Sequence, residues 1–188
     1  MRLYTGKGDQ GETDLLGERV TKNDPRIVAL GALDEASCAM GLGRAMAQTD
    51  QSRAALLQAQ RDLYAIMAEL AFTDDLRPEA QVFPAERVTW LETITDTVMD
   101  GLSLPPAFVV PGDTAGGAAL DIARSVVRRA ERDVLSLTTS STQINEQIGR
   151  YLNRLSSLLF ALARAEDHAA GVVSTPAKTS AARRETGR

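Results

Sequence analysis

Residues 118–137 read AALDIARSVVRRAERDVLSL, and this stretch decides the fold class. Its apolar residues recur at alternating spacings of three and four, which is the period of one buried face of an α-helix. These positions are Leu120, Ala123, Val127, Ala130, Val134 and Leu137. The stretch therefore predicts an amphipathic helix that packs one face against other helices.

Three arginines lie along the edge of this apolar face. Arg124, Arg128 and Arg132 are spaced by four residues, so they stack in one line. Their guanidinium groups repel one another unless water screens them or an anion lies among them, and guanidinium geometry matches carboxylate and phosphate oxygens. Either a solvated, salt-bridged face or an anion site fits this helix alone. On the first interpretation the ion-pair partners would be Asp121, Glu131 and Asp133.

The composition predicts a soluble globular protein built mainly of helices. The 188 residues fit one domain, with 44% hydrophobic and 24% charged residues. Aromatic residues make up only 4%, and the abundance of Ala, Leu and Arg favours helix. A net charge of −4 argues against nucleic-acid binding as the main task.

Cysteine and histidine are too scarce for several kinds of site. Cys38 is the only cysteine, which excludes an internal disulfide and a cysteine-based zinc site. His168 is the only histidine, whereas a di-iron carboxylate bundle needs two Glu-x-x-His pairs. No apolar run reaches the length of a membrane span, and the first residues lack a signal-peptide pattern. We expect a cytoplasmic protein with neither membrane nor nucleic acid as a partner.

Five helices with short links predict an all-α, up-and-down bundle. The first begins at Asp24 and Pro25, since Asp caps free amides and Pro suits the first helical position, and it ends near Ala47. Its glycines 31, 41 and 43 suggest close packing against another helix. The other helices are expected over about 51–72, 85–101, from a cap at Asp113 or Thr114 to 137, and 142–169.

The remaining segments are expected to be irregular. Prolines make residues 104–112 an extended connector. Residues 1–173 should form a single domain, and the polar, basic residues 174–188 a disordered tail. On helix five, Asn153, Ser156 and Ser157 form a polar seam that faces water, another subunit or a ligand.

The N-terminus contains a second unusual stretch, TGKGDQGET at residues 5–13. Its three glycines allow backbone amides to point at an anion, and Lys7 and Thr13 add donors. The stretch is neither a Walker A loop nor a dinucleotide fingerprint, because the required order of residues and elements is absent. Taken alone, it could equally be a polar chain end with no function.

Six motifs in order give the chain a recognisable pattern. They are TGKGDQGET (5–13), GERVTK (17–22), GALDE (31–35), FVVPG (108–112), RRAER (128–132) and YLNRLS (151–156). In this order and spacing the chain resembles the PduO-type ATP:cob(I)alamin adenosyltransferases over about residues 1–170. The resemblance implies an all-α bundle that assembles as a homotrimer, with active sites between subunits and a glycine-rich N-terminal loop around the ATP triphosphate.

The resemblance also assigns site residues. Asp34 would pair with Arg124 of the adjacent subunit near the corrinoid, Phe108 would crowd the lower face of the corrin ring, and Arg128 would complete the catalytic set. Mg²⁺ would arrive with ATP rather than on protein side chains. The residues implied for ATP binding are Thr5, Gly6, Lys7, Gly8, Thr13, Asp14, Lys22, Arg128, Arg129, Glu131, Arg132 and Asn153.

The implied reaction needs no nucleophile or general base from the protein. Cob(I)alamin attacks the 5′ carbon of ATP, triphosphate leaves, and adenosylcobalamin forms. The protein supplies positioning and stabilises negative charge on the leaving triphosphate. A flavin-dependent reductase and an adenosylcobalamin-dependent enzyme are the implied partners.

Several positions depart from the family pattern. Lys7 stands where Thr or Ser is usual, Asp113 replaces a Gly, Asp121 a His, and Ser157 an Asp. Residues 36–38, Ala-Ser-Cys, replace Leu-Asn-Ser. The corrinoid half is therefore less well preserved than the ATP half. This motivates an alternative, a non-catalytic trimer that carries or senses ATP or adenosylcobalamin. A helical oligomer without a ligand is a third possibility.

Overall fold

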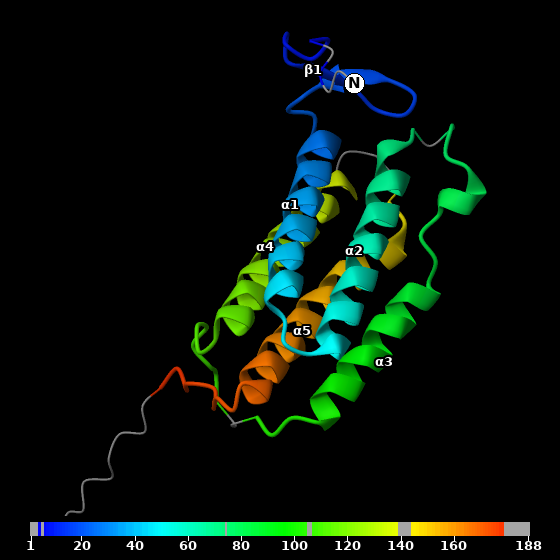
Figure 1. Cartoon of the computed structure of the whole chain (residues 1–188). Coiled ribbons are helices and arrows are strands. Elements are labelled where there is room, and N and C mark those ends of the chain that lie inside the picture. The colour runs from blue at the N-terminus through cyan, green and yellow to red at the C-terminus, as the bar shows by residue number, and fades with distance from the viewer. Residues whose placement is uncertain (1–3, 5, 74, 105–106, 139–143, 179–188) are drawn as a thin grey trace, which may run out of the picture.

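The computed structural model describes residues 4, 6–73, 75–104, 107–138 and 144–178. Within these residues, five α-helices lie side by side and successive helices run in opposite directions (Figure 1). The prediction of an all-α, up-and-down bundle is confirmed. The helices are α1 Pro25–Met46, α2 Asp50–Ala71, α3 Glu86–Asp100, α4 Ala115–Leu137 and α5 Glu146–Ala169, and a short 3₁₀ helix, η1, covers Glu79–Gln81.

Helix α4 packs between α1 and α5. It contacts α1 on one side and α5 on the other, while α2 packs on α1 and α3 packs on α5. Every residue of the predicted apolar face of α4 is at most 1% exposed, as expected for a core face. Gly43 allows α1 to approach closely, because a Cβ there would lie 2.6 Å from Cδ2 of Leu120. A Cβ on Gly31 would meet nothing within 4 Å, so that glycine marks no close contact.

The helix starts follow their capping residues. The Asp24 side chain accepts from the Arg26 amide over 2.8 Å, and Pro25 opens α1 as predicted. Thr114, rather than Asp113, caps α4 by accepting from the Gly117 amide over 2.9 Å. Helix α5 begins later than expected, after Asn145, whose side chain accepts from the Gln147 amide. Positions 142 and 143 of the expected helix lie outside the described residues.

A short hairpin precedes the bundle where irregular chain was expected. Strands β1 (Glu12–Asp14) and β2 (Arg19–Thr21) pair antiparallel. Between them, Gly17 has φ 122°, and a Cβ there would lie 2.6 Å from Thr73 Oγ1. The Leu16 amide donates to the Ala71 carbonyl over 2.9 Å, which fastens the hairpin to the end of α2. Strands of three residues are too short for their periodicity to be read from the sequence.

Residues 174–178, expected to begin a tail, pair instead with the connector before α4. The Val110 amide donates to the Thr175 carbonyl over 2.8 Å, and the Ala177 amide donates to the Phe108 carbonyl over 2.7 Å. The Thr175 hydroxyl donates to Asp113 over 2.6 Å. Residues 179–188 lie beyond the part of the chain that is described.

A buried polar cluster joins α2, α3 and α5. Asp62 accepts from Nε and Nη2 of Arg87 over 2.9 and 2.7 Å, and from the Tyr151 hydroxyl over 2.8 Å. Burial, followed by the neighbouring Asp62 carboxylate, raises the pKa of Tyr151 well above its usual value. Tyr151 is therefore a stable hydrogen-bond donor at neutral pH. Among the described residues, no helix is both long and apolar enough to cross a membrane.

Candidate functional site

The arginine line of α4 borders two grooves. The first encloses about 500 Å³ and has Pro111, Ile122, Arg129 and Arg132 in its lining. The second encloses about 400 Å³ between α3, α4 and α5. Its polar lining comes from Thr95, Arg124, Arg128, Ser156 and Ser157. Arg124 lines both grooves, so the two grooves adjoin at this residue. Two serines of the predicted polar seam thus face a groove.

The carboxylates near the arginines neutralise them only in part. Arg124 Nε contacts Asp121 Oδ1 over 3.1 Å, as the solvated-face interpretation expects. Glu131 instead accepts a hydrogen bond from Asn153 of α5 over 3.1 Å. Within the described part of the chain, no ion pair joins Arg128 to a carboxylate. A cation with this freedom can bind an external anion.

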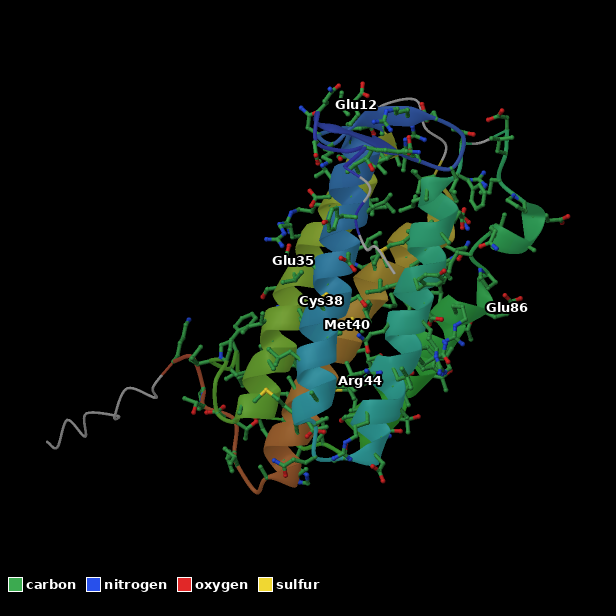
Figure 2. All side chains as sticks on the ribbon, turned by 45° about the horizontal axis from the view of Figure 1, so that its top comes forward. Glu12, Glu35, Cys38, Met40, Arg44 and Glu86 are labelled. Carbon is green, nitrogen blue, oxygen red and sulfur yellow. The ribbon has the colours of Figure 1, made fainter. Side chains whose placement is uncertain are left out.

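Arg129 is paired across two helices. Its Nη2 donates to Glu35 of α1, which projects from the side of α1 nearest α4 (Figure 2). Both side chains are about half exposed, at 47% and 58%, so water screens this pair. The pair therefore holds Arg129 near the first groove without removing it from solvent.

The N-terminal segment is organised by Arg19. Its guanidinium donates to Glu12 over 2.9 Å, to Asp14 over 2.8 Å and to the Lys7 carbonyl over 2.8 Å. Hydrogen bonds to Glu12 and then Asp14 raise the pKa of Arg19. Sequence reasoning assigned no role to Arg19, although it lies inside the GERVTK motif. The cluster fixes the hairpin against the turn that carries Lys7.

The glycines of this turn also fit the expected site. Gly6 has φ 72°, and the Asp9 amide donates to the Gly6 carbonyl over 3.3 Å. A Cβ on Gly8 would lie 3.2 Å from Lys22 Nζ, so glycine leaves room for that ammonium group. Thr13 is half-buried on β1 opposite Val20. Thr5 is not among the described residues.

Within one chain, the N-terminal hairpin and the arginine line of α4, both expected to bind ATP, are not joined in one site. The hairpin with Glu12 lies at one end of the bundle, whereas Glu35 lies further along α1 (Figure 2). No hydrogen bond or ion pair links the hairpin to α4 in the described ranges. Asp34 is exposed on α1 and does not pair with Arg124 of the same chain.

Phe108 is presented to solvent. Its side chain is 90% exposed, which excludes a role as a core anchor within one chain. Its carbonyl accepts from the Ala177 amide, so the backbone is held while the ring is free. Ala107, Phe108, Ala177 and Lys178 line a cavity of about 260 Å³.

A buried charge cluster below Arg124 was not expected from the sequence. Arg164 of α5 is 1% exposed, and its Nη2 lies 2.7 Å from Asp121 Oδ2 and 3.1 Å from Asp167 Oδ2. Thr114, the cap of α4, donates to Asp167 Oδ1 over 2.7 Å. The only sequence signal is the spacing of Arg164 and Asp167 by three residues on a mostly apolar helix.

The sequence matches a known family over most of its length. The family described as "Cobalamin adenosyltransferase" matches residues 3–166. The corrinoid adenosyltransferase PduO of Citrobacter freundii is 40% identical over 170 residues, covering 89% of this chain and 50% of the relative. The chain thus spans about half the length of that PduO protein. The corrinoid adenosyltransferase of Bacillus subtilis is 35% identical over 176 residues, covering 92% and 90%.

A solved structure shows the same fold. It is a variant PduO-type ATP:corrinoid adenosyltransferase from Lactobacillus reuteri, complexed with cobalamin and ATP. The TM-score is 0.86 at 29% sequence identity, and the match covers 95% of this chain and 97% of the other.

Proposed function

Because the chain belongs to the cobalamin adenosyltransferase family, we propose that it transfers the 5′-deoxyadenosyl group of ATP to cob(I)alamin. The Co(I) electron pair forms a cobalt–carbon bond to C5′. The C5′–O bond breaks, and triphosphate leaves with that bond's electron pair. Adenosylcobalamin and triphosphate are the products.

The observation that carries this proposal is the arginine line along the two grooves. Arg128 lines the groove between α3, α4 and α5 and has no carboxylate partner among the described residues, whereas Arg124 beside it is engaged by Asp121. Charge develops on the leaving triphosphate, so a cation that binds it there stabilises the transition state more than the ground state. A solvated face would not need to line a groove.

We assign ATP binding to the hairpin segment and to the exposed side of α4 and α5. The turn amides and Lys22 would contact phosphate oxygens, since glycine-rich turns expose backbone amides to anions. Arg129 and Glu131 would have to exchange their present partners, Glu35 and Asn153, for ligand atoms. The full assignment is Thr5, Gly6, Lys7, Gly8, Thr13, Asp14, Lys22, Arg128, Arg129, Glu131, Arg132 and Asn153.

The separation of the hairpin from the arginine line of α4 within one chain supports a site that is shared between copies of the chain. We propose a homotrimer in which the hairpin of one copy covers α4 of the next. Asp34, exposed and without a carboxylate-binding partner among the described residues, would meet Arg124 of the neighbouring copy. Arg124 uses Nε for Asp121, which leaves its terminal nitrogens for this contact.

The exposed ring of Phe108 suits a role below the corrin. A firmly held backbone and a free aromatic face can exclude water and an axial base from the lower side of cobalt. Removing that ligand would make cob(II)alamin easier to reduce, which is the difficult step. A flavin-dependent reductase would then supply the electron, and an adenosylcobalamin-dependent enzyme would receive the product.

Mg²⁺ would enter with the nucleotide. The described residues bring no three His, Cys, Asp or Glu side chains together in a metal-binding group, so the oxygens of triphosphate are the natural ligands. The ion would share the negative charge with the arginines of α4.

A direct assay tests the activity. Purified protein is mixed with ATP and chemically reduced cobalamin, and adenosylcobalamin formation is followed by absorbance. We expect product with the wild type and a large loss with Arg128→Ala, whereas Arg53→Ala, an exposed arginine on α2, should behave as wild type. Binding of ATP or adenosylcobalamin without product formation would contradict the enzyme and favour the alternative of a carrier or sensor.

A further inference from the structure

Asp121 divides its carboxylate between two arginines of different exposure. Oδ1 contacts Nε of Arg124 over 3.1 Å, and Oδ2 contacts Nη2 of Arg164 over 2.7 Å. The Asp121 side chain is 5% exposed and that of Arg124 is 29% exposed. A nearly buried carboxylate therefore holds Nε of a partly exposed arginine that lines both grooves.

Arg164 is itself fixed on several sides. Its side chain is 1% exposed, it lies 3.1 Å from Asp167, and its guanidinium lies 5.5 Å from the centre of the Phe160 ring. Asp167 accepts from the Thr114 cap, which joins this cluster to the first turn of α4. The cluster thus has little freedom to move relative to α4.

The buried charge cluster of Asp121, Arg164 and Asp167 is expected to add little to the stability of the fold. Burying charged groups loses hydration, which offsets most of their mutual attraction. Nε and Nη1 of Arg164 are buried with no hydrogen-bond partner among the described residues, which adds to that loss. The contact of the cluster with Arg124, through Asp121, offers a functional explanation instead.

We propose that Asp121, backed by Arg164, is a positioning residue that orients Arg124. With Nε held from below, the two terminal nitrogens of Arg124 are directed to the meeting point of the grooves. The inference rests on the proposed function, in which Arg124 contacts the corrinoid half of the site.

The test is a double-mutant cycle with adenosylcobalamin formation as its readout. Asp121→Asn keeps the shape of the side chain and removes its charge. We expect kcat to fall about tenfold or more, while the KM for ATP changes by less than about twofold, because ATP contacts other residues. In an Arg124→Ala background, Asp121→Asn should change kcat by less than about twofold. If the two losses instead multiply, Asp121 does not act through Arg124 and the proposal is overturned.

Asp62→Asn is the matched control. Asp62 is also a nearly buried carboxylate that accepts from an arginine, but its partners are Arg87 of α3 and Tyr151 of α5 rather than Arg124 or Arg164. We expect this variant to lower stability and leave kcat per folded molecule unchanged. Equal losses of kcat in both variants would show a general effect of buried charge and would overturn the proposal.

A second measurement does not depend on activity or on the folding of Asp121→Asn. Nitrogen-15 relaxation of arginine Nε in the wild type should show Arg124 as rigid and the exposed Arg128 as mobile, with the Arg124 signal assigned by its loss in Arg124→Lys. An Arg124 Nε as mobile as that of Arg128 would overturn the proposal. If the wild type forms no adenosylcobalamin, the proposed function fails, and this measurement still decides the positioning of Arg124.

Discussion

Asn153 of α5 donates a hydrogen bond to Glu131 of α4 over 3.1 Å. Its amide oxygen accepts in turn from Arg154 over 3.0 Å. Two side chains proposed to hold ATP therefore orient each other across the α4–α5 interface. Because an exposed hydrogen bond contributes only about 1 kcal/mol, ATP can replace it without a large loss.

Asn153→Asp tests this pair. The substitution places a second carboxylate beside Glu131, where it repels both Glu131 and the triphosphate. We expect ATP binding to weaken about tenfold more than in Asn153→Ala, measured by isothermal titration calorimetry. The difference between the two variants should shrink at high salt, since these groups are exposed. Equal affinities for both variants would place Asn153 away from the nucleotide.

Arg128→Ala tests the arginine line. A charge-assisted hydrogen bond to phosphate contributes roughly 1.5–3 kcal/mol, which corresponds to an increase in the Kd for ATP of about ten- to a hundredfold. Removal of an exposed ion pair usually changes less than about 1 kcal/mol. Calorimetric titration of the folded variant with ATP, with Arg53→Ala as a control, decides whether Arg128 contacts phosphate or is only a solvated surface arginine. Unchanged ATP affinity would show that the arginine line of α4 is a solvated surface and not an ATP site.

The shared site predicts the state of association. We expect a trimer in analytical ultracentrifugation at micromolar concentration. Asp34→Asn should lower kcat about tenfold or more and change the Kd for ATP by less than about twofold, because Asp34 is proposed to meet Arg124 and not the nucleotide. A monomeric wild type would contradict a site built from two copies.

Phe108→Ala separates reduction from transfer. The ring is 90% exposed in one chain, so its removal should leave the thermal unfolding temperature nearly unchanged. An axial ligand should then reach cobalt, and cob(II)alamin should become harder to reduce, while ATP affinity stays the same. Much of the lost rate should return when excess cob(I)alamin is supplied.

Electron paramagnetic resonance gives the direct readout for Phe108. Cob(II)alamin bound to wild type with ATP should include a form without a lower axial ligand, and Phe108→Ala should lose it. Only five-coordinate cobalt in the wild type would rule out the proposed role.

Tyr151 predicts a pH effect at high pH. Its folded pKa is raised above the usual value of 10.0, mainly by burial, so the folded protein keeps the proton that the unfolded chain releases. The stabilisation of the folded protein by protonated Tyr151 is therefore complete below about pH 10, and it is lost as pH rises above that value. Tyr151→Phe should lower the free energy of unfolding at pH 7 by about 1–3 kcal/mol, because it leaves a buried carboxylate with one partner fewer.

Urea denaturation of both proteins between pH 7 and 11 measures this effect. The stability difference between wild type and Tyr151→Phe should narrow above about pH 10. A difference that stays constant over that range would show that the Tyr151 hydroxyl does not titrate differently in the two states.

Local patterns determined much of this protein. The apolar spacing of residues 118–137 and the Asp24–Pro25 helix start are properties of neighbouring residues, so they were predictable from the sequence. The hairpin was not, because β1 and β2 have three residues each and depend on hydrogen bonds between them and to the end of α2.

Contacts between distant residues were decided only by the tertiary structure. Glu35 and Arg129 lie 94 positions apart, and Asp121 and Arg164 lie 43 apart. Their meeting depends on how α1, α4 and α5 rotate and slide against one another, which side-chain packing sets across the whole bundle. The sequence alone therefore determined which helix carries the arginines and that Asp121 lies within reach of Arg124 on it, whereas helix packing decided that Asp121 also meets Arg164 of α5 and that Arg128 is left without a carboxylate among the described residues.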